Sequence, residues 1–198
     1  MSPELETIVS SLREAMPGAG ISLRRNPSPS GQHSMLIEHA DLIKVCQFLR
    51  DQLAFDLLSN VTGVDWPDPA KADLIAVPEG DAGTPANGFL EVLYHLYSTN
   101  QRLGPLVLRA RTADRGQNAT VPSVVSVYRS AEFQEREVFD LYGVVFTGHP
   151  DLRRILMWDE FVDYPMRKDY VAPDDYEYEP TPHDAVLEKA RKHYPAEP

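Results

Sequence analysis

Two neighbouring segments between residues 89 and 111 have the alternating apolar pattern of β-strands, and they constrain the fold more than any other feature. The segment 89–98, FLEVLYHLYS, places four apolar side chains on one face: Leu90, Val92, Tyr94 and Leu96. The segment 105–111 alternates in the same way, with Arg109 and Arg111 expected to point outward. Successive side chains of a strand point to opposite faces, and Phe89, Leu93 and Tyr97 occupy the other face of 89–98. This pattern predicts a strand that is covered on both sides, at least in part.

Three helices with apolar stripes are expected around this sheet. The first begins after Ser2 and carries Leu5, Ile8, Leu12 and Met16 at helical spacing. The second follows Asp41 as its cap and carries Leu42, Val45, Cys46, Leu49 and Leu53. The third spans Ala131–Tyr142, with Ser130 as N-cap and Gly143 as the C-terminal stop.

Further strands are expected at 21–25, at 34–38 and in the run 54–66, the last broken near Asn60 and Gly63. The resulting element order, α-β-β-α-β-β-β-α, predicts an α+β fold of two layers. In such a fold, helices cover one face of a mainly antiparallel sheet.

Regular patterns fade after the third helix, which suggests how the chain is organised. We expect an α+β domain at 1–147, interrupted by a projecting loop at 67–88 that is rich in Pro, Gly, Ala and Asp. Residues 148–198 are expected to form an extended docking segment and tail, with a short helix near 183–193.

Composition excludes several classes of function. The formal net charge of −11 argues against nucleic-acid binding and against direct adsorption to anionic lipid. Cys46 is the single cysteine, so this chain by itself forms no disulfide and holds no Cys-based zinc site or Fe–S cluster. Its apolar neighbours predict that Cys46 is a small core residue. No apolar run approaches the ~20 residues that cross a bilayer.

The stretch 135–149 offers one set of groups for acid–base chemistry, namely Glu135, Glu137, Asp140 and His149. The competing interpretation is a solvated ladder of ion pairs on the helix, Glu132–Arg136 and Arg136–Asp140, both at i,i+4 spacing. No nucleophile, metal or nucleotide motif accompanies these acids, which favours ion pairing.

Asp140 occupies the last turn of its helix, where the helix dipole disfavours a carboxylate. A cation should offset this cost. We therefore expect Arg153 or Arg154 to fold back onto Asp140 after the turn at 148–150.

The whole stretch 135–170 interleaves charges with large apolar side chains, a pattern that suits a surface docking on another protein. The residues expected at this interface are Glu135, Arg136, Glu137, Asp140, Tyr142, His149, Arg153, Arg154, Arg167, Lys168 and Asp169. For any one of them, the alternative is a surface charge that contributes little.

The same stretch resembles the signature of the 30-kDa subunit of respiratory complex I, which in bacteria is the C subunit of NADH-quinone oxidoreductase. The resemblance rests on Glu-Arg-Glu at 135–137, Asp-Leu-Tyr at 140–142, His149, Arg153 and the closing YPMRKDY at 164–170. Tyr164 and Val171 stand where this family usually has a histidine and a proline. A proton-handling role of that histidine therefore does not carry over.

The resemblance implies a scaffold subunit of the peripheral arm that binds no cofactor itself. FMN, Fe–S clusters and quinone would belong to the assembled complex, with the 49-kDa and cluster-bearing subunits as partners. The chain would then lie on the cytoplasmic side of the cell membrane, attached only through the complex. Two alternatives remain open: the equivalent subunit of a complex I-like membrane-bound hydrogenase, and a free-standing acid–base enzyme that uses the 135–149 set.

Overall fold

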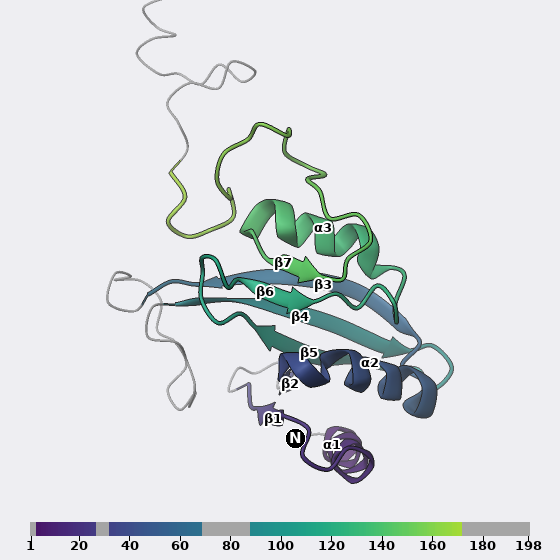
Figure 1. The fold of residues 1–198 in the computed structure, drawn as a ribbon. Coiled ribbons are helices and arrows are strands. Elements are labelled where there is room, and N and C mark those ends of the chain that lie inside the picture. The colour runs from purple at the N-terminus through teal and green to yellow at the C-terminus, as the bar shows by residue number, and fades with distance from the viewer. Residues whose placement is uncertain (1–2, 27–31, 69–87, 172–198) are drawn as a thin grey trace, which may run out of the picture. The chain divides into compact units, whose positions relative to one another are not determined.

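The computed structural model describes residues 3–26, 32–68 and 88–171 (Figure 1). The chain divides into two compact units, Met1–Lys168 and Asp169–Pro198, so residues 148–168 belong to the same unit as the helices and sheets. Most of the expected loop at 67–88, and the tail beyond Val171 with its expected helix near 183–193, lie outside the described residues.

The described part of the first unit contains three helices, a five-stranded sheet and a small second sheet. In chain order these elements are α1 (Pro3–Ala15), β1 (Ile21–Arg24), β2 (Ser34–Ile37), α2 (His39–Leu53), β3 (Leu57–Trp66), β4 (Phe89–Ser98), β5 (Leu103–Arg111), β6 (Thr120–Pro122), α3 (Ala131–Tyr142) and β7 (Val145–Thr147). The large sheet has the order β1-β2-β5-β4-β3. Its neighbours are antiparallel except for the parallel pair β2–β5. The predicted α+β fold with a mainly antiparallel sheet is confirmed.

Details of the strands differ from the sequence-based expectation. β3 runs unbroken through Gly63, where the ring of Tyr142 packs so closely that an added Cβ would lie 2.5 Å from it. The expected irregularity near Asn60 is present as a register shift between Leu58 and Asn60. The parallel pair β6–β7 was not predicted, because three residues are too few to show a period.

One face of the large sheet carries the core. Its side chains on β4, those of Leu90, Val92, Tyr94 and Leu96, are fully buried, as the alternating pattern predicts. They belong to one apolar cluster with the stripes of all three helices, which includes Leu12 of α1, Leu42 of α2 and Val138 of α3. The helices therefore cover this face, and Figure 1 shows α3 lying along β3.

Two predicted caps use their side chains differently. α2 begins at His39 rather than after Asp41, and the Asp41 carboxylate instead accepts a hydrogen bond from the Gly20 N–H at 2.8 Å. Ser130 does precede α3, but its hydroxyl donates to the Leu58 carbonyl at 2.9 Å rather than capping the helix. Both side chains thus join separate elements, a choice that local sequence cannot reveal.

Cys46 lies on α2 with no exposed surface, which confirms it as a core residue. Burial, together with the nearby Glu135 carboxylate, raises the pKa of its thiol to about 12.

Because the thiolate is the reactive form of Cys46, we expect the native protein to react with iodoacetamide at pH 8 at least 100-fold more slowly than the urea-unfolded chain. Mass spectrometry of timed samples measures this ratio, and comparable rates would contradict the buried placement.

Candidate functional site

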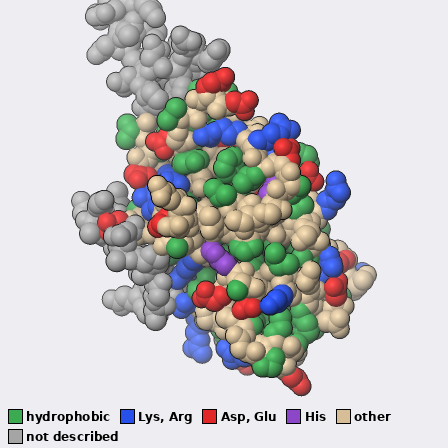
Figure 2. All heavy atoms as spheres, viewed as in Figure 1, with side chains coloured by type: hydrophobic (Ala, Val, Ile, Leu, Met, Phe, Trp, Pro, Cys, Tyr) green, Lys and Arg blue, Asp and Glu red, His purple; other side chains and the backbone are tan. Residues whose placement is uncertain are grey.

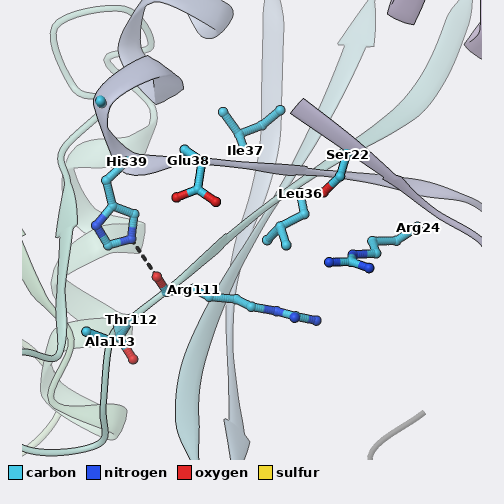
Figure 3. Close-up of a pocket in the computed structure, with 10 residues that line it drawn as sticks. Ser22, Arg24, Leu36, Ile37, Glu38, His39, Arg111, Thr112 and Ala113 are labelled. Atoms are coloured by element: carbon cyan, nitrogen blue, oxygen red, sulfur yellow. Dashed lines mark hydrogen bonds between the residues drawn. The ribbon is translucent and has the colours of Figure 1, made fainter. Parts of the chain in front are cut away.

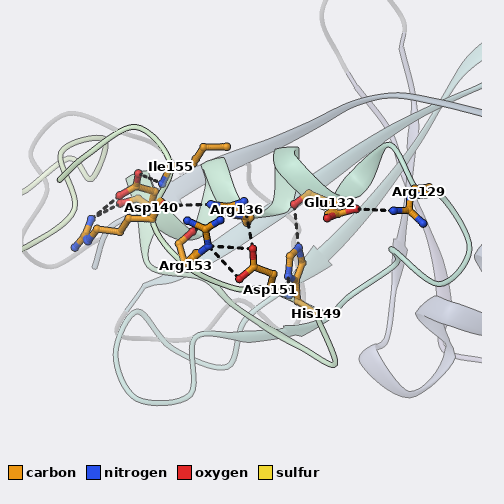
Figure 4. Close-up of polar contacts among 9 residues, drawn as sticks. Arg129, Glu132, Arg136, Asp140, His149, Asp151, Arg153 and Ile155 are labelled. Carbon is orange, nitrogen blue, oxygen red and sulfur yellow. Dashed lines mark hydrogen bonds and ion pairs between the residues drawn. The ribbon is translucent and has the colours of Figure 1, made fainter. Parts of the chain in front are cut away.

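Three charged residues of α3 that were expected at the surface lie inside the unit. Glu135 and Asp140 have no exposed surface, and Arg136 is 4% exposed. The expected ladder of ion pairs along α3 is therefore wrong. Glu132 instead pairs with Arg129, while Arg136 and Asp140 turn to the segment 148–168, here called the C-terminal segment (Figure 4).

Asp140 organises the C-terminal segment through both of its carboxylate oxygens. Oδ2 accepts hydrogen bonds from three successive backbone N–H groups, those of Ile155, Leu156 and Met157, at 2.7–3.0 Å. Oδ1 accepts from Arg154 at 2.6 Å, so the expected pairing with an arginine holds for Arg154. Burial by itself favours the neutral acid, but these donors outweigh it and lower the pKa of Asp140. Asp140 is therefore a fixed anion that shapes residues 154–157.

The C-terminal segment also satisfies the free carbonyl groups at the end of α3. Arg154 donates to the Asp140 carbonyl at 3.0 Å, the Met166 N–H to that of Leu141 at 3.1 Å, and Arg167 to that of Tyr142 at 2.7 Å. Two of the three donors are arginines, whose charge complements the negative end of the helix dipole. The segment is thus held at three carbonyls within one turn of helix.

Tyr164 packs between the two arginines, Arg154 and Arg167. Its ring lies 4.4 Å from the guanidinium carbon of Arg167 and 5.6 Å from that of Arg154. Gly143 makes this approach possible, since it ends α3 with φ of +76° and an added Cβ would lie 2.5 Å from the tyrosine ring. Tyr164 therefore serves a packing role in this chain.

Arg136 and Arg153 have opposite placements. Buried Arg136 donates to the carbonyls of Arg153 and Arg154 at 3.1 and 3.2 Å, which holds residues 153–154 of the C-terminal segment against α3. Arg153 pairs with Asp151 at 3.0 Å instead of with Asp140, and its side chain is 68% exposed. Of the two arginines considered for Asp140, only Arg154 is held inside.

Glu135 faces the core rather than the C-terminal segment. Its two oxygens meet the Ser123 hydroxyl at 2.6 Å and the Val124 N–H at 2.8 Å, so it joins α3 to the chain after β6. Burial raises the pKa of this carboxyl to about 7, although both hydrogen bonds oppose the rise. Glu135 is therefore a protonatable structural group next to the core.

The acid–base set of 135–149 is not assembled into a common site. Glu135 points into the core, Asp140 is enclosed by its donors, and Glu137 is exposed. His149 uses both ring nitrogens locally: Nδ1 accepts from the Asp151 N–H at 3.0 Å, and Nε2 lies 2.9 Å from the Glu132 carbonyl. Since a carbonyl only accepts, Nε2 carries the proton. These contacts do not leave the four groups facing one substrate position.

Asp65 joins β3 to two distant parts of the chain, a role that was not predicted from the sequence. Its buried carboxylate accepts two hydrogen bonds from Arg115 at 2.7 Å and one from the Lys168 N–H at 2.7 Å. It lies on the same face of β3 as Val61 and Gly63, so an acidic residue at an inward strand position was the available signal. The side chain of Lys168 is exposed, as is that of Asp169 at the start of the second unit.

The outer surface of the C-terminal segment carries large apolar side chains that are exposed to solvent. Several large side chains are substantially exposed: Leu156 at 55%, Trp158 at 42%, Val162 at 84% and Met166 at 51%. Figure 2 shows apolar side chains interspersed with charged ones on the face seen there. The segment thus exposes large apolar side chains although its backbone is held on α3.

The described part of the chain shows neither a metal-binding cluster nor a helix that could span a membrane. Within residues 3–26, 32–68 and 88–171, no three His, Cys, Asp or Glu side chains are grouped to hold a metal ion. Over the same residues, none of the helices combines the length and hydropathy that a membrane span requires.

Sequence comparison relates most of the chain to one family. Residues 35–176 match the family described as respiratory-chain NADH dehydrogenase, 30 Kd subunit. The chain is 36% identical to the C subunit of NADH-quinone oxidoreductase from Salinispora tropica over 167 residues, which are 83% of this chain but 60% of that protein. It is 38% identical over 175 residues to the C subunit from Sinorhizobium medicae, and the match covers 86% of this chain and 74% of that protein. The chain thus spans about three fifths to three quarters of these relatives.

Solved structures with the same fold include the Nqo5 trypsin-resistant fragment (1–134), which covers 75% of this chain with a TM-score of 0.51 and 24% identity. A chain from the membrane-bound sulfane sulfur reductase, an archaeal respiratory membrane complex, covers 98% of this chain with a TM-score of 0.60 and 23% identity. At these identities the likeness establishes the fold. The match over 35–176 and the sequence identities of 36% and 38% place this chain in the family of the 30-kDa subunit of respiratory-chain NADH dehydrogenase.

Proposed function

We propose that this chain is a non-redox scaffold subunit of the peripheral arm of a proton-translocating NADH-quinone oxidoreductase. The observation that carries this proposal is the C-terminal segment, which is fastened to α3 from inside and presents apolar side chains outside. Family membership supplies the context for the partner complex.

The hydrogen bonds that hold the C-terminal segment on α3 favour tight docking, because they order the segment before it binds. A flexible segment loses conformational entropy when it binds, whereas residues 154–157 are already ordered by Asp140 and Arg154. Leu156 and Trp158 therefore lie on a backbone that needs little further ordering. Large apolar side chains at the centre of an interface supply most of the binding free energy.

The predicted interface residues divide into three groups under this proposal. Glu137, Arg153 and Lys168, with Asp169 of the second unit, have exposed side chains and would contribute at a polar rim. Arg136, Asp140, Arg154 and Arg167 would act indirectly by holding the C-terminal segment in place, whereas Glu135 would only fix α3 to the chain after β6. Tyr142 and His149 are half-buried, with Tyr142 against β3 and His149 against α3.

We propose the 49-kDa subunit and the cluster-bearing subunits as the partners, on the cytoplasmic side of the cell membrane. FMN, Fe–S clusters and quinone would be held by those other subunits. The inaccessible Cys46 and the use of His149 in local hydrogen bonds support a chain without its own redox centre.

The docking surface is tested with the double variant Leu156→Ser and Val162→Ser. We expect at least a tenfold drop in co-purifying subunits when the tagged chain is captured from gently solubilised native membranes, quantified by mass spectrometry. The free energy of unfolding should stay within about 0.5 kcal/mol, because exposed side chains contribute little to stability.

The matched control is Leu57→Ser, which removes an exposed leucine, at 42% exposure, from β3. It should leave the recovery of partners unchanged. Equal recovery of partner subunits by the wild type and the double variant would refute the docking surface. The identity of the captured subunits tests which complex the chain belongs to. A nickel-bearing subunit in place of a flavin subunit would indicate a membrane-bound hydrogenase. Capture of the chain alone would instead support a free-standing acid–base enzyme.

A further inference from the structure

The C-terminal segment makes a tight turn at 158–161 that carries two adjacent carboxylates. The Phe161 N–H donates to the Trp158 carbonyl at 3.0 Å, which closes the turn. Asp159 and Glu160 are its two central residues, and the side chains of both are exposed. The tip of the turn is therefore a small negative surface that faces solvent.

The base of this turn is held on the folded unit. Phe161 is only 7% exposed and lies edge-on to the ring of Trp158, with the two ring centroids 4.9 Å apart at an angle of 87°. The guanidinium carbon of Arg154 lies 5.5 Å from the centroid of the Phe161 ring, and Arg154 is itself paired with buried Asp140. The turn thus rests on the same contacts that order residues 154–157, so its acidic tip has a defined position.

The acidic tip has no basic neighbour along the chain. Residues 155–166 include three carboxylates, those of Asp159, Glu160 and Asp163, but neither a lysine nor an arginine. Asp163 uses its side chain locally, since its Oδ1 accepts from the Tyr164 N–H at 2.9 Å. Within the part of the chain that the structure describes, Asp159 and Glu160 form no ion pair. Two adjacent like charges repel each other, so a cation brought close to both would be stabilising.

Arginines of the same unit are engaged with other carboxylates. Arg153, the exposed arginine that precedes the turn, pairs with Asp151 at 3.0 Å. Arg111 pairs with Glu91 at 2.8 Å and lines a separate pocket among β1, β2, α2 and the end of β5 (Figure 3). The described residues that line this pocket include none from the C-terminal segment. These positive groups therefore leave the charge of the turn uncompensated.

Exposed apolar side chains flank the acidic tip on both sides. Leu156 precedes it and Val162 follows it, with exposed fractions of 55% and 84%. A protein that covers these two side chains also removes water from Asp159 and Glu160 between them. Because an unpaired carboxylate is costly to bury, such a partner has to bring cations to the turn. The order of side chains along 156–162 thus specifies the charge of the surface that fits it.

We propose that the docking surface binds a basic site of a partner subunit, in which arginine or lysine side chains lie among apolar ones and pair with Asp159 and Glu160. This inference rests on the docking function proposed above and adds the chemistry of the partner. Arginine suits this role best, since its planar guanidinium binds a carboxylate through two N–H groups. The association should also weaken as salt is added, because salt screens charges that are still partly solvated.

Two double variants of the tagged full chain test the sign of the partner's charge. One is neutral, Asp159→Asn with Glu160→Gln, and the other is basic, Asp159→Lys with Glu160→Lys. Each is captured from gently solubilised native membranes, and the co-purifying subunits are quantified by mass spectrometry. Relative to the wild type, we expect recovery to fall at least threefold for the neutral variant and at least tenfold for the basic one. Circular dichroism verifies that both variants are folded.

Glu6→Gln with Glu14→Gln is the matched control, since it removes the same charge from exposed positions of α1, and it should change recovery less than twofold. An equal loss in this control would indicate a general effect of net charge and overturn the proposal. Unchanged or higher recovery with the turn variants would overturn it as well. If the Leu156 and Val162 double variant still lost its partners, the docking surface would stand without a basic partner site. If that variant also retained them, the docking function itself would fail.

Discussion

Replacing Asp140 with asparagine is expected to lower the free energy of unfolding by about 3 kcal/mol, because it removes the anion of a buried pair and leaves Arg154 without its partner charge. An asparagine also accepts less strongly from the three N–H groups of 155–157. For a chain of this size, the melting temperature should fall by roughly 6–12 °C. Urea titration followed by circular dichroism measures the loss.

Asp51→Asn is the control for Asp140, since it removes a carboxylate that is paired with Arg50 at the surface. Surface pairs of this kind contribute about 0–1 kcal/mol, so this variant should change stability little. If the Asp140 and Asp51 variants had equal stability, Asp140 would not organise the C-terminal segment. The pairing itself is tested by a double-mutant cycle with Arg154→Gln, in which the two losses should be clearly non-additive.

Replacing Glu135 with glutamine is expected to change the pH dependence of stability. The unfolded carboxyl titrates near its ordinary pKa of 4.5, whereas burial raises the folded pKa to about 7. Between these values the unfolded chain binds fewer protons than the folded chain, so stability falls as pH rises. The full effect is about 3 kcal/mol and is reached above pH 7.

Glutamine keeps an acceptor for the Val124 N–H and a donor for the Ser123 hydroxyl, but it does not ionise. The variant should therefore match the wild type near pH 4.5 and exceed its stability by as much as about 3 kcal/mol at pH 8. Urea unfolding at a series of pH values gives the difference directly. A constant difference across pH 4.5–8 would mean that Glu135 does not titrate in this range in the folded protein. Glu137→Gln, at an exposed position of the same helix, is the control.

Local sequence patterns were enough to predict the framework of this fold. Alternation in β4 identified the buried face that Leu90 and Tyr94 form, and the helical stripe of α2 identified Cys46 as a core residue. Both follow from the repeat of the regular backbone, because side chains at a fixed spacing must share a face. The dipole argument at the end of α3 likewise predicted an arginine for Asp140, since that cost arises from the helix itself.

Tertiary structure alone decided where the charged residues of α3 point. Neighbours along a helix suggested the pairs Glu132–Arg136 and Arg136–Asp140, but Arg136 bonds carbonyls of 153–154 and Asp140 bonds N–H groups of 155–157. A buried charge binds the donors and acceptors that the folded backbone brings to it, whatever their distance in sequence. Asp65, 103 residues from its partner Lys168, could not have been linked to it by any local pattern. Short-range periodicity thus fixed the layers, and long-range hydrogen bonding fixed the site.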